Sequence, residues 1–425
     1  MFHEKKAKTV YVAMSGGVDS SVAAALLKKQ GFSVVGIFFK PWSPKLETRN
    51  WKLETSFCAW QQDRQDAMRV CAKLGIPFKT WDFSREYGKE VTQYMIDGYR
   101  AGITPNPDVM CNKEIKFGLF LKKALTEGAD YIATGHYARI AVSGERLASR
   151  VKNKKLNARC HTLYTGIDKN KDQSYFLWTL TQGQLKHCLF PIGDYIKPEV
   201  RKMAKKFGLP NHAKKDSQGV CFVGPLNMKE FLKNYIKPRT GEIRILPPNY
   251  DRDKMEVIGG GKNKIIPGKI IGYHDGAYYY TIGQRHGLDI RDGQGPYFVV
   301  GKDVKKNILY VSRGSLFTYQ AYARYVNNRN IVTVENVSWV GEQPKLPLDC
   351  QVKIRYRSES IPAKILSTKS WRGSLANYIG KRPALYLIKF KKSAKALTPG
   401  QSAVFYRGEE VLGGGIITEQ MPQLF

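Results

Sequence analysis

Two cysteines in short polar loops are the residues best suited to carry out chemistry. Cys111 follows the segment PNPDVM (residues 105–110) and precedes Asn112 and Lys113, where the pattern predicts that a helix begins. A helix N-terminus and a nearby lysine both stabilise a thiolate, so Cys111 could act as a nucleophile. Asp108 could transfer a proton or bind a polar substrate group. Taken alone, the same pattern fits a small buried cysteine equally well.

The second candidate, Cys221, lies in the segment DSQGVCFVG (residues 216–224), with Lys214 and Lys215 just before it. Its flanking glycines favour an accessible loop, although a structural role remains an open alternative. The seven cysteines are odd in number and include no Cys-x-x-Cys pair, so neither a disulfide framework nor a zinc ribbon is indicated. The others lack comparable surroundings and are interpreted as core residues: Cys58, Cys71, Cys160, Cys188 and Cys350.

A third feature is a phosphate-binding loop near the N-terminus. The apolar run Val10–Met14 leads directly into SGGVDSS (residues 15–21), which opens a helix. Glycines leave backbone N–H groups accessible, and the helix N-terminus adds a partial positive charge, so an anion is well accommodated. The loop matches neither G-x-x-x-x-G-K-[ST] nor G-x-G-x-x-G. An ordinary glycine turn with a serine cap is the alternative.

The elements that position these loops follow a clear pattern in the first half of the chain. Apolar runs alternate with amphipathic segments, which predicts a parallel sheet with helices on both faces and therefore an α/β fold. The predicted strands are 10–14, 33–39, 78–83 and 131–134, and the predicted helices are 20–30, 62–74 and 113–127.

Beyond about Cys221 the pattern changes to short runs rich in β-branched and aromatic residues. These runs are 278–282, 297–300, 308–311, 331–337, 351–356 and 384–390, and they predict small antiparallel sheets or a barrel. The segment 246–264, rich in proline and glycine, is predicted to be a loop or insertion. We predict three domains: 1–222, 223–302 and 303–425.

The composition indicates a class of partner. The chain has 425 residues, with 69 lysines and arginines against 36 acidic residues and a formal net charge of +33. Such a charge favours a polyanionic partner, of which nucleic acid is the obvious candidate, although a generally lysine-rich composition would give the same balance. No run approaches the ~18 apolar residues of a membrane span. Without a signal-peptide pattern either, we expect a cytoplasmic protein with no membrane partner.

The motifs together resemble a known family. SGGVDSS resembles the PP-loop of the ATP pyrophosphatase superfamily, whose members split ATP between the α- and β-phosphates and place AMP on an oxygen atom. A longer set occurs in the order seen in bacterial tRNA-specific 2-thiouridylases, and it spans the chain from Ser15 to Tyr406. Its members are SGGVDSS, TPNPDVMCNKEIKFG, ATGHYARI, KDQSYFL, DSQGVCFVG, YYYTIGQRHGL and TPGQSAVFY.

The resemblance implies a function and a fold. In this family ATP adenylates the C2 oxygen of the wobble uridine, and persulfide sulfur replaces that oxygen, with release of AMP and pyrophosphate. Carried over by motif, Cys221 would bear the persulfide, and Cys111 would attack it and end in a transient disulfide with Cys221. The implied fold is an N-terminal PP-loop domain resembling adenine nucleotide alpha hydrolases, a small, mostly β, tRNA-binding central domain and a C-terminal β-barrel.

The resemblance also implies binding residues and partners. The site for ATP with Mg²⁺ would comprise Ala13, Met14, Ser15, Gly16, Gly17, Val18, Asp19, Ser20, Phe39 and Gly135. The target base would contact Asn106, Pro107 and Asp108, and the tRNA would contact His136, Lys171, Asp172, Gln173, Arg355, Tyr356 and Gln401. We expect the acceptors to be the tRNAs for Lys, Glu and Gln. The expected sulfur donor is a cysteine desulfurase or a sulfur-relay protein, and the base is expected to be flipped out of its stack.

Alternatives and departures accompany this interpretation. Phe39 stands where the family usually has methionine, and the segment 246–264 is longer than usual. Another PP-loop enzyme, such as an amidating ligase, would explain SGGVDSS but not the paired cysteine loops. A tRNA-binding protein that binds ATP without chemistry is a further alternative. Cys111 and Cys221 could in principle bind an iron–sulfur cluster, but without a three-cysteine set we predict persulfide chemistry and no permanent metal.

Overall fold

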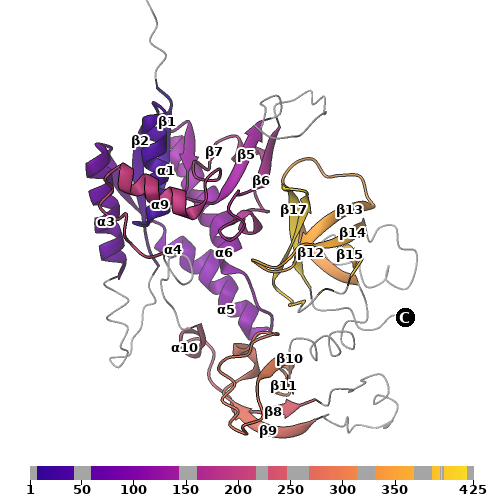
Figure 1. The fold of residues 1–425 in the computed structure, drawn as a ribbon. Helices are drawn as coiled ribbons and strands as arrows, with labels where there is room; N and C mark the ends of the chain where they lie inside the picture. Colours follow the sequence, from indigo (N-terminus) through magenta and orange to yellow (C-terminus); the bar gives the residue numbers. More distant parts are fainter. Residues whose placement is uncertain are drawn as a thin grey trace, which may run out of the picture.

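The computed structural model describes residues 7–42, 59–142, 160–216, 228–246, 268–313, 331–367, 385–392, 394 and 397–418. The first unit lies at the upper left of Figure 1, the barrel of the C-terminal part at the right, and a small sheet at the bottom. Within the described residues no helix is long and apolar enough to cross a bilayer.

The first unit is built on a five-stranded parallel sheet. Its strands have the order β3-β2-β1-β4-β7. They are β1 (Thr9–Met14), β2 (Ser33–Lys40), β3 (Phe78–Asp82), β4 (Tyr131–Ala133) and β7 (Cys188–Leu189). Alternation along β1 sends Val10 and Val12 to one apolar core and Tyr11 to the other, so both faces of the sheet are covered. The predicted α/β fold is confirmed.

Helices cover each face of this sheet. One face packs against α1 (Val18–Lys29), α3 (Ala59–Leu74) and α9 (Lys197–Lys206), whose buried side chains share one core. The other face packs against two longer helical segments (Figure 1). The first comprises α4 (Ser84–Tyr87) and a π-helical turn (Gly88–Thr92), and the second comprises α6 (Pro107–Met110), a π-helical stretch (Cys111–Phe120) and α7 (Leu121–Thr126). The first segment continues as α5 (Gln93–Arg100), whose buried side chains share a core with the central unit.

The central unit is a four-stranded sheet with the order β10-β11-β8-β9. Its elements are α10 (Met228–Lys233), β8 (Gly241–Ile245), β9 (Lys269–His274), β10 (Tyr297–Asp303) and β11 (Ile308–Arg313). Because β10 contains Asp303 and pairs with β11, we propose that this unit ends after Arg313 rather than at 302. The predicted segment 246–264 falls, apart from Leu246, outside the described residues.

One predicted strand in this unit is wrong. Residues 278–282 do not form a strand, because Ala277–Tyr279 make a single turn of 3₁₀ helix. The hydroxyls of Tyr278 and Tyr279 donate hydrogen bonds to the carbonyls of Lys237 and Ile236. The aromatic residues that indicated a strand therefore anchor a turn against the end of α10.

The C-terminal unit is a closed six-stranded antiparallel barrel, as predicted. Its strands follow the order β12-β15-β14-β13-β16-β17, and a further pairing of β12 with β17 closes the ring. They are β12 (Ile331–Trp339), β13 (Leu348–Lys353), β14 (Ile361–Ser367), β15 (Tyr386–Phe390), β16 (Ser402–Arg407) and β17 (Glu410–Ile417).

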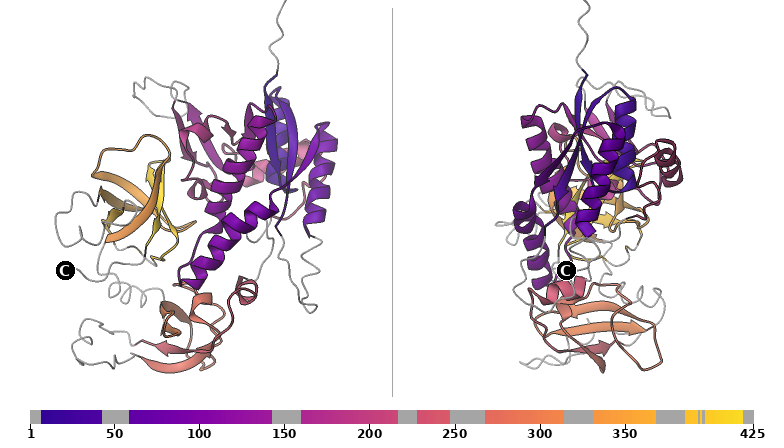
Figure 2. Two further views of the ribbon diagram at one scale, coloured as in Figure 1. Left: turned by 180° about the vertical axis from the view of Figure 1, so that it is seen from behind. Right: turned by 90° about the vertical axis from the view of Figure 1, so that its left-hand side faces the viewer.

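The barrel is joined to the first unit through shared strand pairing. The hairpin of β5 (Ala138–Val142) and β6 (His161–Thr165) extends the barrel sheet, because Tyr164 pairs with Glu410 of β17. The short helix α8 (Gln182–Leu185) follows. Figure 2 shows the barrel beside the first unit and the central sheet below both. The three units therefore surround the segment between α5 and α6.

Candidate active site

The phosphate loop is folded tightly by its own hydroxyl groups. The Ser20 and Ser21 hydroxyls donate to the Gly17 carbonyl at 3.2 and 2.8 Å, and Ser20 Oγ accepts from the Ser15 backbone N–H at 3.2 Å. Gly16 has a φ of 72°, and a Cβ there would lie 2.2 Å from the Asp63 carbonyl oxygen. Only glycine suits this position, because a side chain would meet both backbone strain and a direct clash.

Two further residues hold the loop from outside. A Cβ on Gly135 would lie 2.7 Å from the Ser20 backbone nitrogen, so the chain after β4 approaches the loop as closely as a glycine allows. The buried Asn211 amide donates to the Gly16 carbonyl and to Ser21 Oγ, both at 2.9 Å. Among the described residues, the side-chain oxygen Oδ1 of Asn211 has no hydrogen-bond partner. The glycine-lined approach and the helix N-terminus suit the phosphates of a nucleotide.

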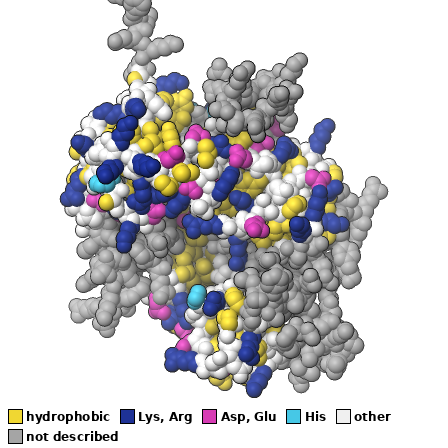
Figure 3. Space-filling view, in the orientation of Figure 1, with side chains coloured by type: hydrophobic (Ala, Val, Ile, Leu, Met, Phe, Trp, Pro, Cys, Tyr) yellow, Lys and Arg dark blue, Asp and Glu magenta, His cyan; other side chains and the backbone are white. Residues whose placement is uncertain are grey.

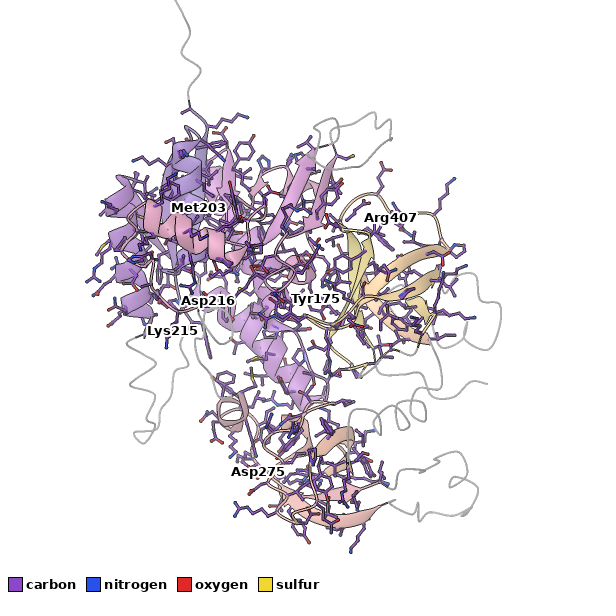
Figure 4. The ribbon with its side chains drawn as sticks, viewed as in Figure 1. Tyr175, Met203, Lys215, Asp216, Asp275 and Arg407 are labelled. Carbon is purple, nitrogen blue, oxygen red and sulfur yellow. The ribbon has the colours of Figure 1, made fainter. Side chains whose placement is uncertain are left out.

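A charged cluster lies beside this loop. Lys197 Nζ contacts both carboxylate oxygens of Asp19, at 2.8 and 2.9 Å, and Asp216 Oδ1 at 2.8 Å. Lys171 and Arg201 also pair with Asp216, at 2.5 and 2.8 Å. Burial alone would raise the pKa of Asp216, but hydrogen bonds from Lys171 and Lys197 lower it to about 2. Asp216 is labelled in Figure 4. It is the last described residue before Cys221, which itself lies outside the described residues.

The loop that leads to Cys111 has the features of a well-formed helix start. The Asn106 side chain accepts a hydrogen bond from the Val109 backbone N–H at 3.4 Å, and Pro107 occupies the first helical turn. Asp108 is partly exposed, but Cys111 is fully buried and belongs to the apolar core. Lys113, which was expected to support a thiolate, is ion-paired with Glu114 at 2.8 Å. The structure therefore holds Cys111 enclosed rather than exposed.

All three units meet at Thr104, just before this helix start. The Thr104 backbone N–H donates to the Pro399 carbonyl at 2.9 Å, and its hydroxyl lies 3.5 Å from that of Thr281. Gln401 Nε2 donates to the carbonyls of Thr104 and Pro105, at 2.9 and 3.4 Å. Gln401 is predicted to contact tRNA. In this structure it stabilises, through two hydrogen bonds, the loop that is predicted to contact the target base.

Arg355 and Tyr356, two further predicted RNA residues, also connect the units. Arg355 donates to the Ile282 carbonyl at 2.7 Å and to the Thr398 hydroxyl, which joins the central unit to the barrel. The Tyr356 ring lies 4.6 Å from that of Phe176, and the Phe176 carbonyl accepts from Asn112 at 3.2 Å. A chain of contacts therefore runs from the barrel to the neighbour of Cys111.

The segment Lys171–Gln173 lies between the phosphate loop and the barrel. Asp172 is buried, and its side chain lies 3.4 Å from Lys353 Nζ of β13. Gln173 Oε1 accepts from the Tyr137 backbone N–H at 3.1 Å, while the Tyr137 hydroxyl donates to Asp19 at 2.9 Å. Tyr175, labelled in Figure 4, donates to the Ser402 carbonyl of the barrel at 2.8 Å. This segment therefore links the phosphate loop to the barrel.

Two predicted contact residues are buried in this structure. His136 Nδ1 lies 2.7 Å from the Thr134 hydroxyl, and its ring lies 5.8 Å from that of Phe117. Burial, and to a smaller degree the charge of Lys116, lowers the pKa of His136 well below its usual value. Phe39 is 5% exposed, and its ring lies 4.8 Å from that of Phe120. The roles of both residues toward ligands stay predictions.

Comparison with known proteins assigns the chain to a family. Three family models match it: a tRNA methyl transferase HUP domain over residues 8–225, a tRNA methyl transferase PRC-barrel domain over 229–313, and an aminomethyltransferase beta-barrel domain over 329–374 and 377–417. A tRNA-specific 2-thiouridylase MnmA from Bacillus licheniformis is 43% identical over 416 residues, covering 96% of this chain and 95% of that protein. The chain belongs to the tRNA-specific 2-thiouridylase family. The relative of the same name from Bacillus subtilis is 41% identical, with the same coverage.

The family models mention methyl transfer, whereas the full-length relatives are named 2-thiouridylases. The similarity to these relatives extends across all three units of the chain. Among solved structures, a 4-thiouridine synthetase–RNA complex with bound ATP covers 53% of this chain and 50% of that chain. The TM-score is 0.33 and the sequence identity is 19%.

The residues predicted from the sequence do not include Asp216, Lys197 and Arg201 of the charged cluster or Asn211 beside the phosphate loop. Asp216 begins the motif that contains Cys221, which was a usable signal. Nothing in the sequence around Lys197 or Asn211 indicated their contacts, because their partners Asp19 and Gly16 are 178 and 195 positions away. Among the described residues, no group of three or more His, Cys, Asp or Glu side chains is arranged to bind a metal ion.

Proposed function

We propose that this 2-thiouridylase thiolates the wobble uridine of tRNA at C2 in an ATP-dependent reaction. The observation that carries the proposal is the 41–43% identity, over 96% of the chain, to relatives named tRNA-specific 2-thiouridylase. The acceptors are the tRNAs for Lys, Glu and Gln, and a cysteine desulfurase or a sulfur-relay protein delivers the sulfur. Because this chemistry acts on tRNA, we place the protein in the cytoplasm.

The first half of the reaction uses the phosphate loop. A carbonyl oxygen is a poor leaving group, and ATP with Mg²⁺ supplies the AMP that converts the uridine C2 oxygen into a good one. The backbone N–H groups in the first turn of α1 bind the phosphates, while those of Ser15 and Gly17 donate within the loop. Asn211 and Gly135 support the proposal, since a hydrogen bond from Asn211 and the close approach of Gly135 restrict this loop to one conformation.

The second half of the reaction uses the two cysteines. The terminal sulfur of a Cys221 persulfide attacks C2, and AMP leaves with the original oxygen. The Cys111 thiolate then attacks Cys221 Sγ and breaks the sulfur–sulfur bond, so that the transferred sulfur stays on C2. A Cys111–Cys221 disulfide forms, and an external thiol reduces it before the next turnover. Asn106, Pro107 and Asp108 lie against the flipped base.

The burial of Cys111 adds a requirement to this sequence of steps. Its thiol is enclosed in the apolar core, so the helix start at 107–111 has to rearrange before the thiol can react. The contacts of Thr104 and Gln401 hold this loop through neutral hydrogen bonds, each of which contributes about 0.5–1.5 kcal/mol. Binding of tRNA across the units can supply energy of that size.

The test is thiolation of an unmodified tRNA by the purified full-length protein with ATP, a cysteine desulfurase and cysteine. We expect 2-thiouridine at the wobble position, with one AMP released for each thiolated base. Cys111→Ala and Cys221→Ala are each expected to abolish the product while tRNA affinity is retained. Nucleoside mass spectrometry and filter binding give the two measurements.

Cys350→Ala is the matched control, because burial raises the pKa of that thiol to about 12 and keeps it unreactive. It is expected to thiolate tRNA at the wild-type rate. Full activity in either the Cys111 or the Cys221 variant would remove that cysteine from the mechanism. AMP release without any thiolated product from the wild-type protein would contradict the proposed function itself.

A further inference from the structure

A buried lysine joins the phosphate loop to the segment that follows α9. Lys197 is the first residue of α9 and is 9% exposed, yet its ammonium group reaches two carboxylates from distant parts of the chain. These are Asp19, in the first turn of α1, and Asp216. A buried ammonium ion requires such partners, because loss of hydration is otherwise costly.

The backbone of Lys197 is fixed as firmly as its side chain. Its N–H donates to Asp168 Oδ2 at 2.9 Å, while Asp168 Oδ1 accepts from the backbone N–H of Asn170 at 3.0 Å and of Lys171 at 3.2 Å. Asp168 is itself buried. One carboxylate therefore positions both lysines that pair with Asp216.

The charge of Lys197 matters for what the adjacent loop binds. Asp19 lies at the helix N-terminus where an anion is accommodated, and an unpaired carboxylate there would repel a triphosphate. The other described hydrogen bond to its side chain comes from the neutral Tyr137 hydroxyl. Lys197 is thus the cation that neutralises Asp19 among the described residues.

We infer that Lys197 is a positioning residue of the nucleotide site, which neutralises Asp19 and ties it to Asp216. This inference rests on the proposed function, since it concerns ATP binding by the same loop. Lys197 touches no reacting atom in this role. It acts through Asp19, and it couples the head of α1 to the segment that leads toward the second cysteine loop.

The test compares Lys197→Met, Lys197→Arg and, as a matched control, Lys205→Met on an exposed position of the same helix. We expect Lys197→Met to raise the KM for ATP about tenfold or more, the equivalent of one lost charge interaction, with tRNA affinity unchanged. Lys197→Arg is expected to restore most of the ATP affinity, and Lys205→Met to match the wild type. A role confined to folding would instead lower the melting temperature and kcat without a selective change in KM.

A double-mutant cycle with Asp216→Asn tests the link to Asp216. If Lys197 acts partly through Asp216, the effect of Lys197→Met on KM is smaller in the Asp216→Asn background. The Asp216 side chain is 33% exposed, so Asp216→Asn is expected to fold even if Lys197→Met does not. In that case Asp216→Asn alone tests the inference, and a several-fold rise in the KM for ATP is expected. An unchanged KM for ATP in the variants would overturn the inference. Because wild-type thiolation is measured in the same assay, its absence would identify failure of the proposed function separately.

Discussion

The phosphate loop and the loop that ends at Cys111 are held in place by contacts of different origin. Every described contact to the phosphate loop comes from within the first 216 residues: Asp63, Gly135 and Asn211 pack against or bond to it. The loop before Cys111 instead depends on Thr281 of the central unit and Gln401 of the barrel. The phosphate loop is therefore positioned within one unit, whereas the loop before Cys111 also takes contacts from the other two units.

The two regions also differ in the kind of interaction. Close glycine approaches and buried ion pairs fix the phosphate loop, and such contacts leave little room for adjustment. Neutral hydrogen bonds to backbone carbonyls hold the other loop, and these are easily exchanged for contacts with a substrate. We therefore expect ATP binding and sulfur transfer to respond separately to substitution.

Gly135→Ala gives the largest expected effect and acts on the phosphate loop alone. The added Cβ would lie 2.7 Å from the Ser20 backbone nitrogen, so the loop has to move. Overpacking of this kind costs about 1–3 kcal/mol, which predicts a loss of ATP affinity of about 5- to 150-fold. Equilibrium binding of a non-hydrolysable ATP analogue measures this, and tRNA affinity is expected to stay at the wild-type value.

Gly341→Ala is the matched control, because a Cβ at that position meets no atom within 4 Å. It is expected to change neither the affinity for the ATP analogue nor the affinity for tRNA. A parallel loss of tRNA affinity in Gly135→Ala would show that the first unit does not bind nucleotide independently of the rest, and the contrast between the two regions would fail.

Gln401→Ala acts on the other region and is expected to have a moderate effect. The substitution leaves the Thr104 carbonyl without its 2.9 Å hydrogen bond, so the loop before Cys111 loses a brace from the barrel. One such bond is worth about 1 kcal/mol, which predicts a fall in kcat of about fivefold with the KM for ATP unchanged. Steady-state thiolation at saturating tRNA provides the measurement.

Gln343→Ala, at an exposed position of the barrel, controls for the loss of a glutamine there. A rise in the KM for ATP in Gln401→Ala would mean that the barrel influences the phosphate loop, contrary to the division above. An unchanged kcat would mean that the loop keeps its geometry without this brace.

Local patterns in the sequence were enough to predict the fold class, most strands and the phosphate loop. The loop is predictable because its hydroxyls bond to a carbonyl three or four residues away, so the motif carries its own geometry. The strand over 10–14 is β1, and the helix predicted over 62–74 lies within α3. The short β-rich runs predicted small antiparallel sheets or a barrel, and the family resemblance implied the barrel.

Features that depend on distant partners escaped prediction. Lys197 pairs with Asp19 across 178 positions, and nothing near either residue indicates the other. Cys111 is buried in a core that includes residues of the first unit and of the barrel, whereas its immediate neighbours fitted a reactive thiolate and a buried cysteine equally well. Residues 278–282 have strand-forming side chains, but tertiary hydrogen bonds from two tyrosines make a turn instead.

The substitution His136→Gln is expected to have the smallest effect. It tests whether the His136 side chain is shielded from solvent in the folded protein. Because burial lowers its pKa, the folded protein leaves His136 neutral at a pH where the unfolded chain, with a pKa of about 6.5, takes up a proton. Its contribution is therefore complete above pH ~6.5 and is lost as the pH falls toward the lower, folded-state pKa. Between pH ~7.5 and ~5.5, the wild type is expected to lose on the order of 1 kcal/mol more than His136→Gln.

Urea unfolding of both proteins at the two pH values measures this difference, and the same substitution at the exposed His286 controls for the loss of a histidine. Equal losses in wild type and His136→Gln would mean that the folded protein protonates His136 as readily as the unfolded chain does. The imidazole would then face solvent, where it could meet RNA directly. The predicted loss would instead show that His136 is shielded from solvent beside Thr134 and Phe117, so that any influence on tRNA passes through the packing of the first unit.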